Sequence, residues 1–149
     1  MASPAPTHIN RMDSQTRKRR IVNLMGYFEF NGAASPTVVR IPGVLSSAAI
    51  VYAATGKLLV KLDSRYTDIS VLAAIQIHTF PSDVEVVVSD IVLNDTATNN
   101  GNTTILLQAT TSSTGAAVAP PASVTGPLGN RCHLWISACL GDKDFSSAN

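Results

Sequence analysis

The chain has 149 residues and a net charge of +1, with 45% hydrophobic and only 14% charged residues. This length is that of one ordinary domain, and the apolar content excludes an intrinsically disordered chain. Ser, Thr, Ala and Val are abundant while Lys and Glu are scarce, a balance that favours β-strands over helices.

The charge is unevenly distributed along the chain. Residues 1–20 contain five Lys/Arg and one Asp, a net charge of +4, whereas residues 21–149 contain six Lys/Arg and nine Asp/Glu, a net charge of −3. The first stretch has Pro, Ser and Thr but no apolar period. We therefore predict a flexible basic arm over residues 1–19, a β-domain over residues 20–141 and a polar tail over residues 142–149.

The first predicted strand begins at Arg20 and ends at an Asn31-Gly32 turn. Its apolar residues alternate with period two, interrupted at Gly26, and place one set on the buried face: Val22, Leu24, Phe28 and Phe30. A short strand is expected over residues 37–41, between two prolines. A hairpin follows, with strands over 50–54 and 57–62 joined at Thr55-Gly56.

The next strand is predicted over residues 69–77, with Ile69, Val71, Ala73, Ile75 and Ile77 facing inward. In residues 84–94 the apolar alternation slips by one at Ser89-Asp90, which predicts a β-bulge or a strand that crosses between sheets. Residues 95–102 form a polar loop and residues 103–110 another strand. Residues 111–130 form a long Gly/Pro/Ala/Ser connection, which makes them a candidate contact loop.

The last predicted strand covers residues 131–140, with one apolar set: Cys132, Leu134, Ile136, Ala138 and Leu140. About eight strands at near-regular spacing, with no helical period, predict an all-β chain. The expected architecture is an antiparallel β-sandwich of jelly-roll or related topology, or a barrel.

The sequence offers no constellation typical of an enzyme. His8, His78 and His133 do not lie at metal-ligand spacing with another ligand residue. No G-x-S-x-G elbow or phosphate-binding loop is present.

Cys132 and Cys139, seven residues apart in one strand, should face opposite sides and not bridge each other. We therefore expect a protein that is not an enzyme, with no cofactor and no metal, in a reducing cytoplasm. The longest apolar run, residues 44–54, is too short to span a bilayer.

Four adjacent cations, Arg17, Lys18, Arg19 and Arg20, have three interpretations. They would bind phosphates of a nucleic acid, keep the apolar first strand from aggregating, or contact an acidic protein surface. The mildly acidic body and the scarcity of arginine–aromatic clusters disfavour nucleic acid. The other two interpretations stay open.

Trp135 is the single tryptophan of the chain. With Arg131 and His133 it falls on the face of the last strand opposite the Leu134 and Ile136 set. If only one face of that strand is buried within a subunit, these three residues form an oligomer interface with tryptophan as its anchor. Coverage of both faces within one subunit is the alternative.

The order of these signals resembles a known family. The relevant segments are RIV at 20–22, GYFEFNGA at 26–33, TGKLLVKL at 55–62, YTD at 66–68 and NRCHLWI at 130–136. Over about residues 18–141 the chain is similar to the capsid decoration, or cement, proteins of tailed bacteriophages. No diagnostic site exists for a residue-by-residue match, and residues 111–130 have no counterpart.

The resemblance implies a homotrimer on the outer surface of a phage head. Its partners would be the major capsid protein and its own copies, with neither nucleic acid nor membrane bound. It would be made in the bacterial cytoplasm and end in the virion. The run from Arg17 to Arg20 is then the expected capsid contact, and Arg131, His133 and Trp135 are the expected oligomer contact.

Two other functions compete with this reading. A tail or head-fibre attachment module would bind host-surface glycan through residues 95–102 and 111–130, although these loops contain no aromatic residue for stacking on sugars. A small jelly-roll hydrolase or cupin would need paired histidines and a carboxylate, which the sequence lacks.

Overall fold

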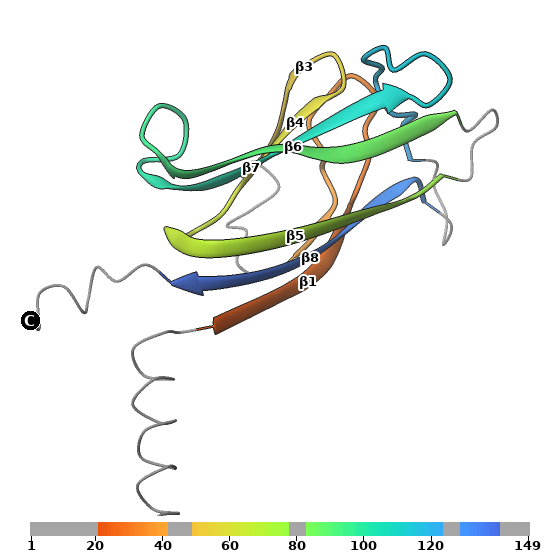
Figure 1. Cartoon of the computed structure of the whole chain (residues 1–149). Coiled ribbons are helices and arrows are strands. Elements are labelled where there is room, and N and C mark those ends of the chain that lie inside the picture. The colour runs from red at the N-terminus through yellow and green to blue at the C-terminus, as the bar shows by residue number, and fades with distance from the viewer. Residues whose placement is uncertain (1–20, 42–48, 78–82, 124–128, 141–149) are drawn as a thin grey trace, which may run out of the picture.

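The computed structural model describes residues 21–41, 49–77, 83–123 and 129–140, and these form two four-stranded antiparallel sheets packed face to face (Figure 1). Eight strands make up the sheets: β1 (Ile21–Glu29), β2 (Val39–Arg40), β3 (Ile50–Ala54), β4 (Lys57–Lys61), β5 (Tyr66–Gln76), β6 (Val84–Asp95), β7 (Asn102–Thr111) and β8 (Arg131–Leu140). The described residues contain no α-helix. The predicted β-sandwich is confirmed.

One sheet has the order β2-β1-β8-β5 and the other the order β3-β4-β7-β6. The first and last strands therefore lie side by side in the middle of one sheet, paired from Ile21 opposite Cys139 to Glu29 opposite Arg131. The β3–β4 hairpin lies where the sequence predicts it. A jelly-roll topology stays a prediction, because the strand orders establish only the sandwich.

Strand β1 follows the predicted alternation. Leu24, Phe28 and Phe30 are buried, and Val22 packs against the same core. The rings of Phe28 and Phe30 meet edge to face with centroids 5.5 Å apart, an arrangement that aromatic pairs favour. The inward set of β8 is buried as predicted over Cys132, Leu134, Ile136 and Ala138.

Gly26 interrupts the apolar alternation of β1 because the backbone of the next strand lies directly against it. A Cβ atom at this position would lie 2.1 Å from the carbonyl oxygen of Arg40 and 2.7 Å from the Cα atom of Ile41. Only glycine permits the short pairing of Tyr27 with Arg40 and of Phe28 with Val39 that joins β2 to β1.

Strand β6 contains the predicted bulge. Its pairing with β7 shifts between Val88 and Asp90, so Val88 before the shift and Ile91 after it both lie opposite buried residues of β7, Leu107 and Ile105. Leu93, farther along the strand, is 41% exposed. Strand β5 contains another register shift, between Thr67 and Ile69, with Asp68 in the left-handed region at φ 40°. This shift lets Tyr66 and Ile69 both face the core.

The connection before β8 is held against the sandwich in its described parts. Asn130 is fully buried, and its amide nitrogen donates hydrogen bonds to the carbonyl oxygens of Ala122 at 3.0 Å and Pro121 at 3.3 Å. The backbone nitrogen of Ser123 donates to the carbonyl oxygen of Phe30 at 2.7 Å. Buried amides with such partners fix a loop that has no strand of its own.

The domain boundaries at residues 20 and 141 stay predictions. The predicted arm over residues 1–19 and the tail over residues 142–149 lie outside the described residues, as does Arg20.

Candidate functional site

The candidate site is the outer face of the sheet that contains β1, β8 and β5. Because β8 pairs with both neighbours, the outward residues of the three strands form rows across the sheet. From one end to the other the rows are Glu29–Arg131–Gln76, Tyr27–His133–Ala74, Met25–Trp135–Leu72, Asn23–Ser137–Ser70 and Ile21–Cys139–Thr67. These five rows are called the outer face below.

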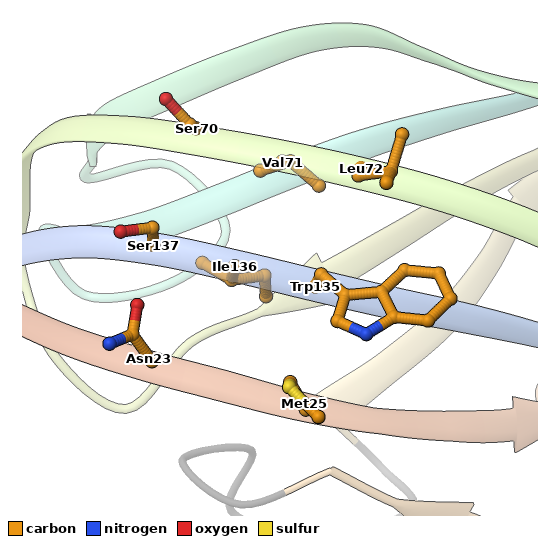
Figure 2. Close-up of a pocket in the computed structure, with 8 residues that line it drawn as sticks. All are labelled: Asn23, Met25, Ser70, Val71, Leu72, Trp135, Ile136 and Ser137. Carbon is orange, nitrogen blue, oxygen red and sulfur yellow. The ribbon is translucent and has the colours of Figure 1, made fainter.

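The middle row is an apolar ridge made of Met25, Trp135 and Leu72. Figure 2 shows the three side chains together, one from each strand, with the indole over the central strand. Met25 is 62% exposed, Leu72 63% and Trp135 39%. A contiguous apolar patch of this kind on a folded chain usually marks an interaction surface.

Beside the ridge lies a row of short polar side chains, Asn23, Ser137 and Ser70 (Figure 2). The difference in side-chain length leaves a shallow groove of about 300 Å³, lined by these residues, by the ridge and by Val71 and Ile136. Beyond the groove Ile21 is again well exposed. From the ridge to this end of the outer face, the rows are thus apolar, then small and polar, then partly apolar.

Arg131 is engaged within its own chain. Its Nε and Nη2 atoms donate to Oε1 of Glu29 at 3.2 and 3.1 Å. Its guanidinium also lies 4.5 Å from the ring centroid of Tyr27, a cation–π contact. This arrangement neutralises the charge at one end of the outer face.

His133 links the charged end to the apolar ridge. Its ring lies 5.6 Å from the centroid of Tyr27 and 6.2 Å from that of Trp135, nearly parallel to the indole at 23°. Its Nε2 atom lies 3.4 Å from Oε1 of Gln76. His133 therefore stacks beside the indole, while Trp135 remains 39% exposed.

The structure brings Arg131, His133 and Trp135 together on one exposed face, where the sequence places them. Their assignment to an oligomer interface stays a prediction. Sequence reasoning did not name Met25, Leu72 or Tyr27 as part of the same site, because that requires the pairing of β8 with β1 and β5. The predicted capsid contact from Arg17 to Arg20 lies outside the described residues and directly precedes Ile21 in the chain.

The two cysteines lie on opposite faces of β8, as the strand pattern predicts. Both are free, with Cys132 in the core and Cys139 on the outer face. Burial raises the pKa of the Cys132 thiol to about 12, so this thiol is unreactive at neutral pH. Within the described ranges no group of three or more His, Cys, Asp or Glu side chains is placed to hold a metal ion.

The loop between β6 and β7, a candidate glycan loop, is organised around Asp95. The carboxylate of this buried residue accepts hydrogen bonds from the Thr98 hydroxyl and, at 2.9 Å, from the Thr98 backbone nitrogen. Asn99 is also buried, and its amide donates to the carbonyl oxygens of Leu62 and Thr103 at 3.0 and 2.9 Å. The side chains of Asp95, Thr98 and Asn99 therefore stabilise the fold of this loop.

Replacement of Asp95 by asparagine should lower the free energy of unfolding at pH 7 by about 1 kcal/mol, because a charge-assisted hydrogen bond becomes a neutral one. The Thr98 hydroxyl lowers the pKa of Asp95. A lowered folded-state pKa stabilises the fold above the unfolded value of about 3.9 and loses that contribution as pH falls through the folded value. The difference between wild type and D95N in urea unfolding should therefore narrow below about pH 4.

The matched control is E85Q, which neutralises an exposed carboxylate on β6. It should differ little from wild type at either pH. A D95N deficit that is the same at pH 7 and at pH 2.5 would show that the ionised Asp95 does not stabilise this loop.

No protein family, no curated protein and no solved structure matches the chain. Among the residues that the structure covers, no helix is long and apolar enough to cross a membrane. The outer face is therefore the described feature on which a function can be based.

Proposed function

We propose that this chain is a structural virion protein, a decoration or cement protein of a tailed-phage head. It binds the outer surface of the head as a homotrimer and stabilises contacts between major capsid protein subunits. The observation that carries the proposal is the exposed apolar ridge Met25–Trp135–Leu72, built on three neighbouring strands of one sheet. An apolar surface on a sheet is suited to binding another protein surface, and the sequence resemblance indicates which kind of assembly.

The work of such a protein is mechanical. A trimer that binds the assembled shell and not the free subunits stabilises the shell by its own binding free energy. Residues 21–149 carry a net charge of −3 and the preceding residues +4. The run from Arg17 to Arg20 is therefore the part of the chain best suited to contact an acidic capsid surface.

Deletion of residues 1–20 tests the capsid contact. The proposal requires a major capsid protein gene beside the gene for this chain, and heads assembled from that protein are the binding partner in the assay. The truncated chain should keep the number of chains per assembly and the β-sheet circular dichroism signal of the full chain, because the described strands all lie after residue 20. Its affinity for heads in co-sedimentation should fall at least tenfold, from the loss of several charge pairs.

A quadruple change of Arg17, Lys18, Arg19 and Arg20 to glutamine should reproduce the loss, while a K57Q/K61Q variant, altered on β4, should bind as wild type. Unchanged affinity of the truncated chain would remove the arm from the mechanism. Absence of head binding by the full chain would overturn the proposed function.

A glycan-binding attachment module is the second candidate, favoured by one observation, the exposed indole of Trp135. Aromatic faces stack on sugar rings, and this indole lies on a flat sheet face with a groove beside it. Specific hits on a glycan array that are lost in a W135A variant would support this candidate over head binding.

A further inference from the structure

We infer that the outer face is the surface through which copies of this chain contact one another. Trp135 faces the axis of the assembly, and the Met25 side of one copy lies against the Leu72 side of the next. This inference rests on the homotrimer in the proposed function and identifies its surface. The occupant of the outer face is thus a second copy and not the capsid.

The position of Trp135 within the sheet supports this arrangement. β8 lies between β1 and β5, and Trp135 is in register with Met25 on one side and Leu72 on the other. Two different apolar flanks on either side of a central aromatic residue permit a head-to-tail contact, in which each copy offers one flank to each neighbour. A contact of this type closes into a ring of three when each copy is rotated by one third of a turn from the next.

The charges of the outer face also favour a second copy. Identical subunits bring identical charges, so a charged centre would place like charges close together. The three middle rows contain no Lys, Arg, Asp or Glu. Charged groups border them instead: the internally paired Glu29 and Arg131 at one end, Arg40 beside Tyr27, and Asp68 at the bulge.

The size of the outer face corresponds to a small contact with each neighbour. Strands lie about 4.8 Å apart and successive rows about 6.7 Å apart, so five rows on three strands cover roughly 30 by 15 Å. A head-to-tail contact divides this face between two neighbours, so each contact is smaller than the roughly 800 Å² that each partner contributes to a standard interface. The groove over Asn23, Ser137 and Ser70 gives room for the longer side chains of a neighbour.

A charge on the ridge tests the surface. Leu72→Asp should reduce the mass in light scattering from three chains to one, 15.7 kDa, because a carboxylate would be buried without a partner. Leu72 is exposed within one chain, so the variant should keep its circular dichroism spectrum and unfolding midpoint as a monomer. Val87→Asp is the matched control, since Val87 is 49% exposed on β6 of the opposite sheet, and it should stay oligomeric. An L72D variant that keeps the wild-type mass would overturn the inference.

Cross-linking tests the arrangement without loss of assembly. In a Cys139→Ser background, the double variant M25C/L72C should form a covalent species of three chains under mild oxidation. Within one chain these positions are separated by β8, about 10 Å apart, beyond the ~7 Å that a disulfide spans. Each single variant should remain uncross-linked. Cross-linking of M25C to itself, or no cross-link in an oligomeric double variant, would contradict the head-to-tail contact.

The two proposals fail in different ways. A chain that assembles through the outer face but does not bind heads leaves this inference standing and removes the proposed function. A chain that binds heads while L72D retains the wild-type mass removes this inference alone.

Discussion

Truncation of Phe28 to alanine should lower the free energy of unfolding by about 3–5 kcal/mol. The phenyl ring is fully buried between the sheets and packs edge to face on Phe30. Its removal loses the transfer free energy of the ring and leaves a cavity that paired strands on both sides keep from collapsing. Because single domains are stable by only about 5–15 kcal/mol, this loss is a large part of the total. Urea unfolding followed by tryptophan fluorescence measures it.

Val87→Ala serves as the control, since this exposed side chain contributes little burial. Its unfolding midpoint should stay close to that of wild type. The conservative variant Phe28→Leu should fall between the two. If F28A unfolded at the same urea concentration as V87A, the core described for β1 would be wrong.

Replacement of Gly26 by alanine should lower the free energy of unfolding by about 3 kcal/mol. The added methyl group would clash with backbone atoms, which, unlike a side chain, cannot move away by changing rotamer. The new Cβ atom would lie 2.1 Å from the carbonyl oxygen of Arg40, so β2 has to separate from β1. Hydrogen exchange should show faster exchange at the Glu29 amide, which donates to the carbonyl oxygen of Val38 at 3.0 Å. The same measurement on β4 and β7 should change little.

The control for Gly26→Ala is Val87→Ile, which also adds one carbon but at an exposed site. It should leave both stability and exchange unchanged. A fully stable G26A protein with protected Glu29 would show that β2 does not lie against Gly26 in solution.

Much of the sandwich could be predicted from alternation alone. In β1 and β8 the alternation of apolar residues correctly predicts which residues are buried, because one face of each strand packs on the core and the other does not. The bulge at Ser89-Asp90 can be predicted from the sequence for the same reason, since one extra residue in the strand inverts the apolar alternation that follows it.

Other features of the fold have no local signal. The register shift at Asp68 alters the pattern only after a single inward residue, Tyr66, and is therefore invisible in the sequence. The buried Asn130 looks like an ordinary loop residue until its partners near Pro121 and Ala122 are known. The adjacency of β1 and β8, more than 100 residues apart in the chain, is a non-local pairing that composition does not encode.

The candidate site, too, has one part that the sequence predicts and another that only the strand pairing shows. That Trp135 faces outward follows from parity in β8, and the structure places it there at 39% exposure. The partners of Trp135 across the sheet, Met25 and Leu72, follow only from strand register. The engagement of Arg131 with Glu29 and Tyr27 likewise depends on β1 lying beside β8.

The mass of the full chain in solution, measured by light scattering across a range of concentrations, tests the account most directly. Both the decoration function and the role of the outer face require copies of this chain to associate. The account predicts a species of three chains, each of 15.7 kDa, that persists on dilution. A single chain of 15.7 kDa at every concentration would contradict it.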